Sequence, residues 1–217
     1  SNKRFQLKPY EVFIMNKIVK LKTDYNSAQK KQEEALVDVI NNSPEKLFIL
    51  ELDDVYTAGT SSNIETDYIN KKIPLIETGR GGQITYHGPG QIVAYPIINL
   101  NNREKDLKKY IQNLQLWIIN TLEQFNIDAF TTDDVGVWVK TPTGIKKIAA
   151  IGIRVRKWVT FHGIALNVNP DLTKFNGIIP CGIKEHGVTS ISEILNKELS
   201  NSDIEKTLIE EFNKIFN

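Results

Sequence analysis

Residues 80–100 read Arg80-Gly-Gly-Gln-Ile-Thr-Tyr-His87-Gly-Pro-Gly-Gln91, followed by Ile92-Val-Ala-Tyr-Pro-Ile-Ile-Asn-Leu100. The first part is rich in glycine, which lets a backbone turn freely and lets a ligand approach it closely. The second part is an apolar run typical of a strand. Pro96 cannot donate a ladder hydrogen bond, so the pattern predicts an edge strand or a bulge over Gln91–Leu100. The glycines around His87 suggest that this side chain is held at the rim of a pocket.

Outward from this stretch, helical and strand patterns alternate. Apolar periodicity predicts helices over Ser27–Asn41 and over 104–125, and strands over Leu47–Leu52, Ile73–Thr78, Val135–Val139, Lys147–Arg154 and Val159–Val168. The stripe expected on the second helix consists of Leu107, Ile111, Leu114, Ile118, Leu122 and Phe125. Capping boxes Ser190-x-x-Glu193 and Ser202-x-x-Glu205 predict two closing helices. We therefore expect an α+β (mixed α/β) fold, a single domain over residues 1–217 with a central mixed sheet flanked by helices.

Composition excludes several classes of function. The chain has 217 residues, 41% of them apolar, and its 27 basic and 26 acidic side chains give a net charge of +1. That balance argues against a polybasic nucleic-acid surface. No apolar stretch approaches the roughly 18 residues of a membrane helix. The single cysteine fits a reducing compartment, and we expect a cytoplasmic protein.

The motifs give no support for a cofactor. The glycine-rich segment matches neither the dinucleotide fingerprint G-x-G-x-x-G nor the phosphate loop G-x-x-x-x-G-K-[ST]. The three histidines are scattered along the chain and lack metal-ligand spacing. We therefore expect neither a nucleotide cofactor nor a metal.

Cys181 lies between Pro180 and Gly182, a pattern that predicts a turn lifting the thiol off regular structure. A free cysteine is most often a small apolar core residue, but a core residue seldom needs so sharp a bend. As a nucleophile it has to be a thiolate, which a neighbouring cation favours. His87, His162 and Lys147 are the candidates. A Cys–His pair would indicate a hydrolase, and a Cys–Lys pair would suit acyl transfer to an amine. Spacing does not choose between them.

Lys147 precedes a run of small residues, Ile148-Ala-Ala-Ile-Gly-Ile153. Small side chains in a strand allow something else to approach closely. Strand alternation predicts that Lys147, Ala149 and Ile151 share one face, with Lys146 pointing the other way.

Taken together, these segments resemble the lipoyl(octanoyl) transferases, from about Leu47 to Ile194. Six blocks follow in family order: Arg80 to Pro96, Gly136-Val-Trp-Val139, Lys147-Ile-Ala-Ala-Ile-Gly152, His162-Gly-Ile-Ala-Leu-Asn167, Pro180-Cys-Gly182 and Gly187-Val-Thr-Ser190. The resemblance implies the fold of biotin and lipoate protein ligases, and a catalytic dyad of Cys181 and Lys147.

The resemblance also implies the rest of the site and the partners. The acyl chain would be held by Arg80, Gly81, Gly82, Gln83, Ile84, Thr85, Tyr86 and His87, by Ala150, Ile151 and Gly152, and by His162, Gly163, Ile164 and Ala165. The donor would be octanoyl-acyl carrier protein. The acceptors would be lipoyl domains of 2-oxoacid dehydrogenase complexes and the glycine cleavage H protein.

One block departs from the family pattern. The family often has Glu-His-Pro-Pro before Val-Tyr-Thr-x-Gly, where this chain has Glu51-Leu-Asp-Asp-Val-Tyr-Thr-Ala-Gly59. The departure removes support for a role of this loop in lining the acyl pocket.

Three other functions remain as alternatives to octanoyl transfer. They are an ATP-dependent lipoate or biotin ligase of the same fold, a Cys–His hydrolase or amidotransferase, and a non-catalytic acyl- or protein-binding module.

Overall fold

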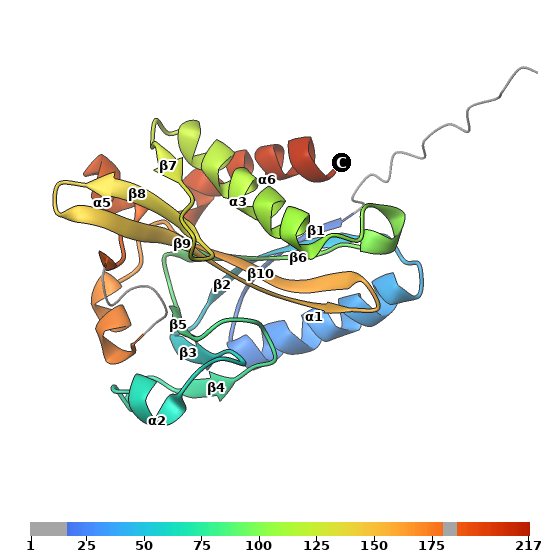
Figure 1. Ribbon diagram of the computed structural model, residues 1–217, viewed down its shortest axis with the longest axis horizontal. Coiled ribbons are helices and arrows are strands. Elements are labelled where there is room, and N and C mark those ends of the chain that lie inside the picture. Colours follow the sequence, from blue (N-terminus) through green and yellow to red (C-terminus); the bar gives the residue numbers. More distant parts are fainter. Residues whose placement is uncertain (1–16, 180–185) are drawn as a thin grey trace, which may run out of the picture.

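The computed structural model describes residues 17–179 and 186–217 and contains two sheets (Figure 1). The larger has the order β1-β2-β6-β10-β9-β8-β7, and the smaller has the order β4-β3-β5. The strands of the larger sheet are β1 (Lys17–Thr23), β2 (Lys46–Leu52), β6 (Gln91–Ile97), β7 (Ala129–Phe130), β8 (Val137–Thr141), β9 (Gly144–Arg156) and β10 (Val159–Asn167). Only the pairing of β1 with β2 is parallel there, so the sheet is mixed, as predicted.

Helices cover both faces of the larger sheet. In Figure 1, α3 (Leu107–Glu123) and α6 (Asn201–Phe216) lie on one side, and α1 (Tyr25–Ile40) lies on the other. The smaller sheet, β3 (Val55–Ala58), β4 (Leu75–Glu77) and β5 (Ile84–His87), lies near the start of α1. The short elements are α2 (Ile64–Asp67), η1 (Leu100–Asn102), η2 (Leu172–Gly177) and α5 (Ile191–Leu195).

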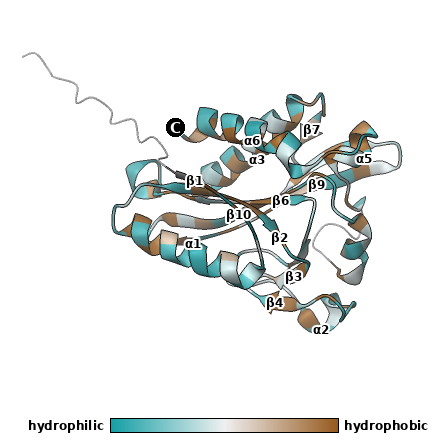
Figure 2. Ribbon diagram, turned by 180° about the vertical axis from the view of Figure 1, so that it is seen from behind, coloured by the Kyte–Doolittle hydropathy of each residue, from teal (hydrophilic) through white to brown (hydrophobic). Residues whose placement is uncertain are grey.

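Alternate side chains of the central strands feed two separate cores. Leu47 and Ile49 of β2 join the core under α3 and α6, whereas Phe48 and Leu50 join the core under α1. A strand buried on both faces reads as a continuous apolar run, which is why β2 and β6 show no polar alternation. Figure 2 shows the same contrast, with brown strands inside and teal on the outer sides of the helices.

Pro96 lies in a central strand, so the predicted edge position is wrong. β6 pairs with β2 on one side and with β10 on the other. The ladder with β10 ends at the Ala94–Ile164 pair. Beyond it the hydroxyl of Thr160 donates to the Pro96 carbonyl (2.9 Å) and accepts from the Ile98 N–H (3.1 Å). The Thr160 hydroxyl therefore supplies two hydrogen bonds beside the proline, while the Thr160 backbone N–H still donates to the Ile98 carbonyl (2.9 Å).

The predicted helices are present with shifted details. Leu114, Ile118 and Leu122 are buried on α3 as expected, but Leu107 is 40% exposed and Trp117 is buried instead. The cap of α5 is confirmed, because the Ser190 hydroxyl accepts from the Glu193 N–H.

The capping box predicted for the last helix is displaced. α6 begins with a box formed by Ser200 and Asp203, not by Ser202 and Glu205. Glu205 instead forms an ion pair with Lys20 of β1 (2.8 Å). Across the part of the chain that the structure describes, no helix combines the length and apolarity needed to cross a membrane.

Candidate active site

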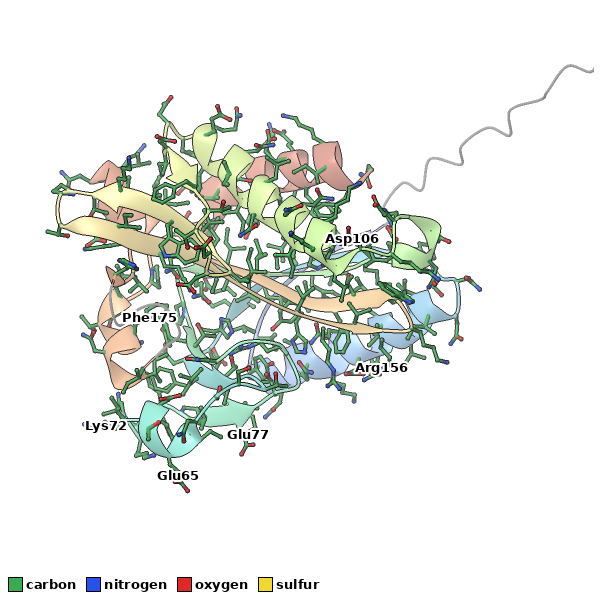
Figure 3. The ribbon with its side chains drawn as sticks, viewed as in Figure 1. Glu65, Lys72, Glu77, Asp106, Arg156 and Phe175 are labelled. Carbon is green, nitrogen blue, oxygen red and sulfur yellow. The ribbon has the colours of Figure 1, made fainter. Side chains whose placement is uncertain are left out.

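A cavity of about 350 Å³ lies between the two sheets, at the start of α1. Its walls come from Tyr25, from β5, β6, β9 and β10, from η2, and from three connecting segments. The lining residues are Tyr25, Arg80, Gly82, Gln83, Ile84, Thr85, His87, Gln91, Val93, Tyr95, Asp133, Asp134, Val135, Lys147, Ala149, Ala150, Ile151, Gly152, His162, Gly163, Ile164, Ala165, Asn167, Phe175 and Val188. The surface that these residues present to the cavity is mostly apolar, and Phe175 of η2 is labelled in Figure 3.

Arg80 is a buried cation in this wall. Its guanidinium donates to the Thr57 carbonyl (2.6 Å), to the Thr57 hydroxyl (2.8 Å) and to the Gly81 carbonyl (3.0 Å). These acceptors are neutral, and burial lowers the pKa of Arg80 below its ordinary value. Gly59 makes the arrangement possible, because a Cβ there would lie 2.7 Å from Nη1 of Arg80.

His87, at the end of β5, is neutral in a fixed tautomer. The amide nitrogen of Gln91 donates to the Tyr86 carbonyl (3.1 Å) and to Oδ1 of Asn167 (3.0 Å), so its oxygen is the group that faces Nδ1 of His87 (2.7 Å). Nδ1 therefore carries the proton. Burial, aided by the charge of Arg80, lowers the pKa of His87 to about 4. The ring stacks on Tyr25.

His162 has the opposite tautomer. Its backbone N–H donates to Oε1 of Gln32 (2.7 Å), which turns the amide nitrogen of Gln32 toward Nδ1 (3.3 Å). Nδ1 accepts, so the proton is on Nε2. Burial first, then the charges of Arg80 and Arg154, lower the pKa of His162 to about 3. Its φ of 57° is in the left-handed region.

Lys147 enters the cavity because of a β-bulge. Trp138 of β8 pairs with Lys147, but Val137 pairs with Ala149, so Ile148 is an extra residue on β9. Ala149 and Ile151 consequently belong to the core side with Val137, and Lys147 lies on the other side with its partner Trp138. The prediction that Lys147, Ala149 and Ile151 share one face is wrong, because an inserted residue reverses the alternation.

The backbone of Lys147 is tied to the segment 187–189. Its N–H donates to the Gly187 carbonyl (3.1 Å), and its carbonyl accepts from the Thr189 N–H (2.9 Å). The Lys147 side chain is 8% exposed, and Nζ lies 4.9 Å from the centroid of the Trp138 ring.

Two buried amides join these parts, and the sequence analysis did not single them out. Gln91 binds Asn167, and Nδ2 of Asn167 donates to the Thr189 carbonyl (3.1 Å). A continuous chain of hydrogen bonds thus runs from His87 to the segment 187–189, which bonds to the backbone of Lys147. Gln91 and Asn167 are the last residues of the segments Arg80–Gln91 and His162–Asn167. That position is the sequence signal that could have identified them.

Cys181 lies outside the described residues. On the chain before it, the Ile179 N–H donates to the Asp67 carbonyl (3.0 Å). On the chain after it, Val188 forms an isolated bridge with Lys147. These contacts place the two flanks of residues 180–185 against α2 and β9.

The structure brings most of the other predicted residues together. The cavity is lined by every predicted acyl-holding residue except Gly81 and Tyr86. Tyr86 packs in the core of the small sheet, and its hydroxyl donates to Asp54 (2.5 Å). Tyr25, Tyr95 and the segment 133–135 also line the cavity but were missed, since they lie outside the motifs quoted for the acyl site.

The departing block 51–59 supports the site without lining it. Among the described residues that face the cavity, none comes from this block. Thr57 instead receives the hydrogen bonds of Arg80, and Asp54 also binds Lys174 (2.6 Å).

Comparisons with known proteins agree with this geometry. A family model described as the lipoyl protein ligase A/B catalytic domain matches residues 24–213. An octanoyltransferase of Wolbachia pipientis is 48% identical over 95% of this chain and 99% of its own length. An octanoyltransferase of Rickettsia prowazekii is 51% identical over 89% of this chain and 94% of its own.

Solved structures show the fold at lower identity. Lipoate-protein ligase A bound with ATP superposes with a TM-score of 0.74 at 18% identity, covering 93% of this chain and 85% of that one. A bipartite lipoate protein ligase of Thermoplasma acidophilum gives 0.71 at 19%, covering 92% and 82%. The expected ligase-like fold is confirmed. The chain therefore belongs to the family of lipoyl protein ligase A/B catalytic domains and, within it, to the octanoyltransferases, which are acyltransferases.

Proposed function

We propose that this protein transfers an octanoyl group from octanoyl-acyl carrier protein to a lysine of a lipoyl domain, through a thioester on Cys181. The observation that carries the proposal is the buried Lys147 in the wall of a mostly apolar cavity that the glycine-rich segment also lines. The octanoyltransferase relatives, near half identity over nearly the whole chain, support the same reaction.

The first step is acylation of Cys181. The thiolate attacks the thioester carbonyl, a new carbon–sulfur bond forms, and the bond to the carrier's thiol breaks. The departing thiolate takes a proton from the ammonium of Lys147, which becomes a neutral amine. Exchange of one thioester for another is nearly isoenergetic, so this step needs no ATP.

The second step is transfer to the acceptor. A neutral lysine amine of the lipoyl domain attacks the acyl-Cys181 thioester, the amide bond forms, and the Cys181 thiolate leaves. The proton lost by the attacking amine passes to Lys147, which restores the ammonium. Lys147 thus gives one proton and recovers one in each turnover.

The cavity walls bind the acyl chain. Small side chains at Ala150, Gly152, Gly163 and Ala165 leave room beside the strands, and Val93 and Ile84 add apolar surface. Burial of each methylene contributes about 0.8 kcal/mol. We assign Arg80 and the glycine-rich segment to binding the substrate. We place the reaction in the cytoplasm, with lipoyl domains of 2-oxoacid dehydrogenase complexes and the glycine cleavage H protein as acceptors.

The test is the intact mass of the protein after mixing with octanoyl-acyl carrier protein without ATP. We expect an octanoyl adduct on Cys181 that a lipoyl domain discharges. Cys181→Ser abolishes the adduct, and Lys147→Ala slows its formation at neutral pH. Lys146→Ala is the matched control. Lys146 pairs with Val139 on the core side of the sheet, so we expect its replacement to leave the rate unchanged.

Other outcomes overturn the proposal. Amide formation from free octanoate only after ATP is added would identify a ligase. Release of octanoate without an amine would identify a hydrolase. The absence of both adduct and product would identify a binding module.

A further inference from the structure

Trp138 is buried beside the side chain proposed to move protons. It lies on β8, its side chain is 1% exposed, and it belongs to the Gly136-Val-Trp-Val139 block for which the reaction gave no role. Nζ of Lys147 lies 4.9 Å from the centroid of its ring. That distance is within the roughly 6 Å at which a cation is attracted to an aromatic face.

Two backbone features create this contact. The bulge at Ile148 puts Lys147 directly across from Trp138 in the ladder. Gly136 then leaves the space that the pair occupies, because a Cβ there would lie 3.1 Å from Cη2 of Trp138 and 3.2 Å from Cε of Lys147. The ring and the lysine are therefore brought together by the fold rather than by a chance surface encounter.

We propose that Trp138 is a positioning residue of the acyl transfer, and that its indole face holds the ammonium of Lys147 in place within the cavity. Tryptophan offers the strongest aromatic face for a cation, and the attraction is largest where water is excluded. The inference rests on the proposed function, in which Lys147 begins and ends each turnover as an ammonium.

A held ammonium has a purpose in that cycle. The lysine side chain is a flexible four-carbon stem that loses rotamer entropy when it is fixed. An ammonium that is out of place before the first half-reaction, or that cannot re-form in place during the second, would slow the corresponding proton transfer. The ring attracts the ammonium without accepting its proton. A carboxylate partner, by contrast, could accept that proton.

The experiment weakens the negative potential of the indole face without changing the shape of the ring. Trp138 is replaced, at that position alone, by tryptophan carrying one to three fluorines, which withdraw electron density at almost constant volume. Lysine side chains labelled with ¹³C and ¹⁵N are followed by NMR, and Lys147→Arg identifies the Lys147 signal. Single-turnover transfer from octanoyl-acyl carrier protein to a lipoyl domain is measured on the same samples.

We expect the pH midpoint of the Lys147 signal to fall stepwise with each fluorine, and transfer to slow by about five- to tenfold over the series. Other charged or titratable groups that line the cavity (Tyr25, Arg80, His87, Tyr95, Asp133, Asp134 and His162) are unchanged in it. Trp138→Leu provides the full loss of the ring. Trp138→Phe, which keeps an aromatic face, is expected to recover part of the rate.

Trp158 is the matched control. It is a second tryptophan with a lysine over its ring, Lys105 at 5.9 Å, and it lies outside the cavity lining. Fluorination there leaves the Lys147 signal and the transfer rate unchanged.

An identical midpoint and rate across the Trp138 series would overturn the assignment of Trp138. A series that shifts the Lys147 signal in a protein that transfers no octanoyl group would overturn the proposed function and leave Trp138 as the residue that holds Lys147.

Discussion

At the scale of single residues, the two cavity histidines link stability to pH. Their pKa values, about 4 for His87 and about 3 for His162, lie below the value of about 6.5 in an unfolded chain. Between these limits the unfolded chain binds more protons, so the free energy of unfolding falls as pH drops from about 6.5 toward 4. The contribution of the two neutral histidines to the free energy of unfolding is fully present above about pH 6.5.

We expect His162→Asn to flatten this pH dependence. Asparagine tolerates the left-handed backbone at this position but does not titrate in the range. One histidine accounts for about 2 kcal/mol between pH 7.5 and pH 5. Urea unfolding at both pH values measures the difference for wild type and variant. Equal differences in the two proteins would show that His162 is not held neutral by the fold.

Sequence reasoning reached the identity of these residues but not their state. His87 and His162 stand out because each is followed directly by a glycine. The tautomer of His162 depends on Gln32, which lies 130 positions away in the chain and was read only as part of a helix. Likewise Lys147 was found, but the bulge at Ile148 that turns it toward Trp138 depends on pairing with another strand.

At the scale of elements, the Thr160 hydroxyl completes the hydrogen bonding between β6 and β10 beside Pro96. Thr160→Val keeps the shape of the side chain but removes its hydroxyl, leaving the buried N–H of Ile98 without that acceptor. We expect a loss of about 1–3 kcal/mol in the free energy of unfolding, measured in urea. Thr160→Ser retains the hydroxyl and should recover most of the loss. An unchanged free energy of unfolding in Thr160→Val would mean that β6 and β10 pair equally well without this hydroxyl.

The start of α6 provides a second test between neighbouring serines. Ser200 forms a capping box with Asp203, whose carboxylate accepts from the Ser200 N–H (2.7 Å) and hydroxyl (2.8 Å). Ser200→Ala should destabilise the protein by about 1 kcal/mol, whereas Ser202→Ala, inside the first turn, should cost far less. Thermal unfolding of both variants makes the comparison. A larger effect at Ser202 would restore the cap predicted from sequence.

Elements were predictable where periodicity was strong and less so at their ends. The strand over Leu47–Leu52 and the helix over 104–125 follow from apolar spacing. The box observed at Ser200 and the box predicted at Ser202 differ by only two positions. Glu205 forms an ion pair with Lys20, a partner that no local pattern reveals. Pro96 in a central strand depends on Thr160 in the same way.

At the scale of the whole molecule, both cores are built on one sheet. Because neighbouring residues of β2 and β6 face opposite cores, neither core survives loss of those strands. We therefore expect the predicted single domain to unfold in one step. Hydrogen exchange followed by mass spectrometry across a urea series should give α1 and α6 the same midpoint. Separate midpoints would divide the chain into two folding units.

The edge strands of the larger sheet affect how the protein behaves at high concentration. One outer strand, β1, carries Lys20 and Lys22, and the other, β7, extends over Ala129–Phe130 alone. Charged or very short outer strands resist the edge-to-edge pairing of one sheet with another. The two ends of the larger sheet in this way protect the protein from polymerising with its own copies through strand pairing.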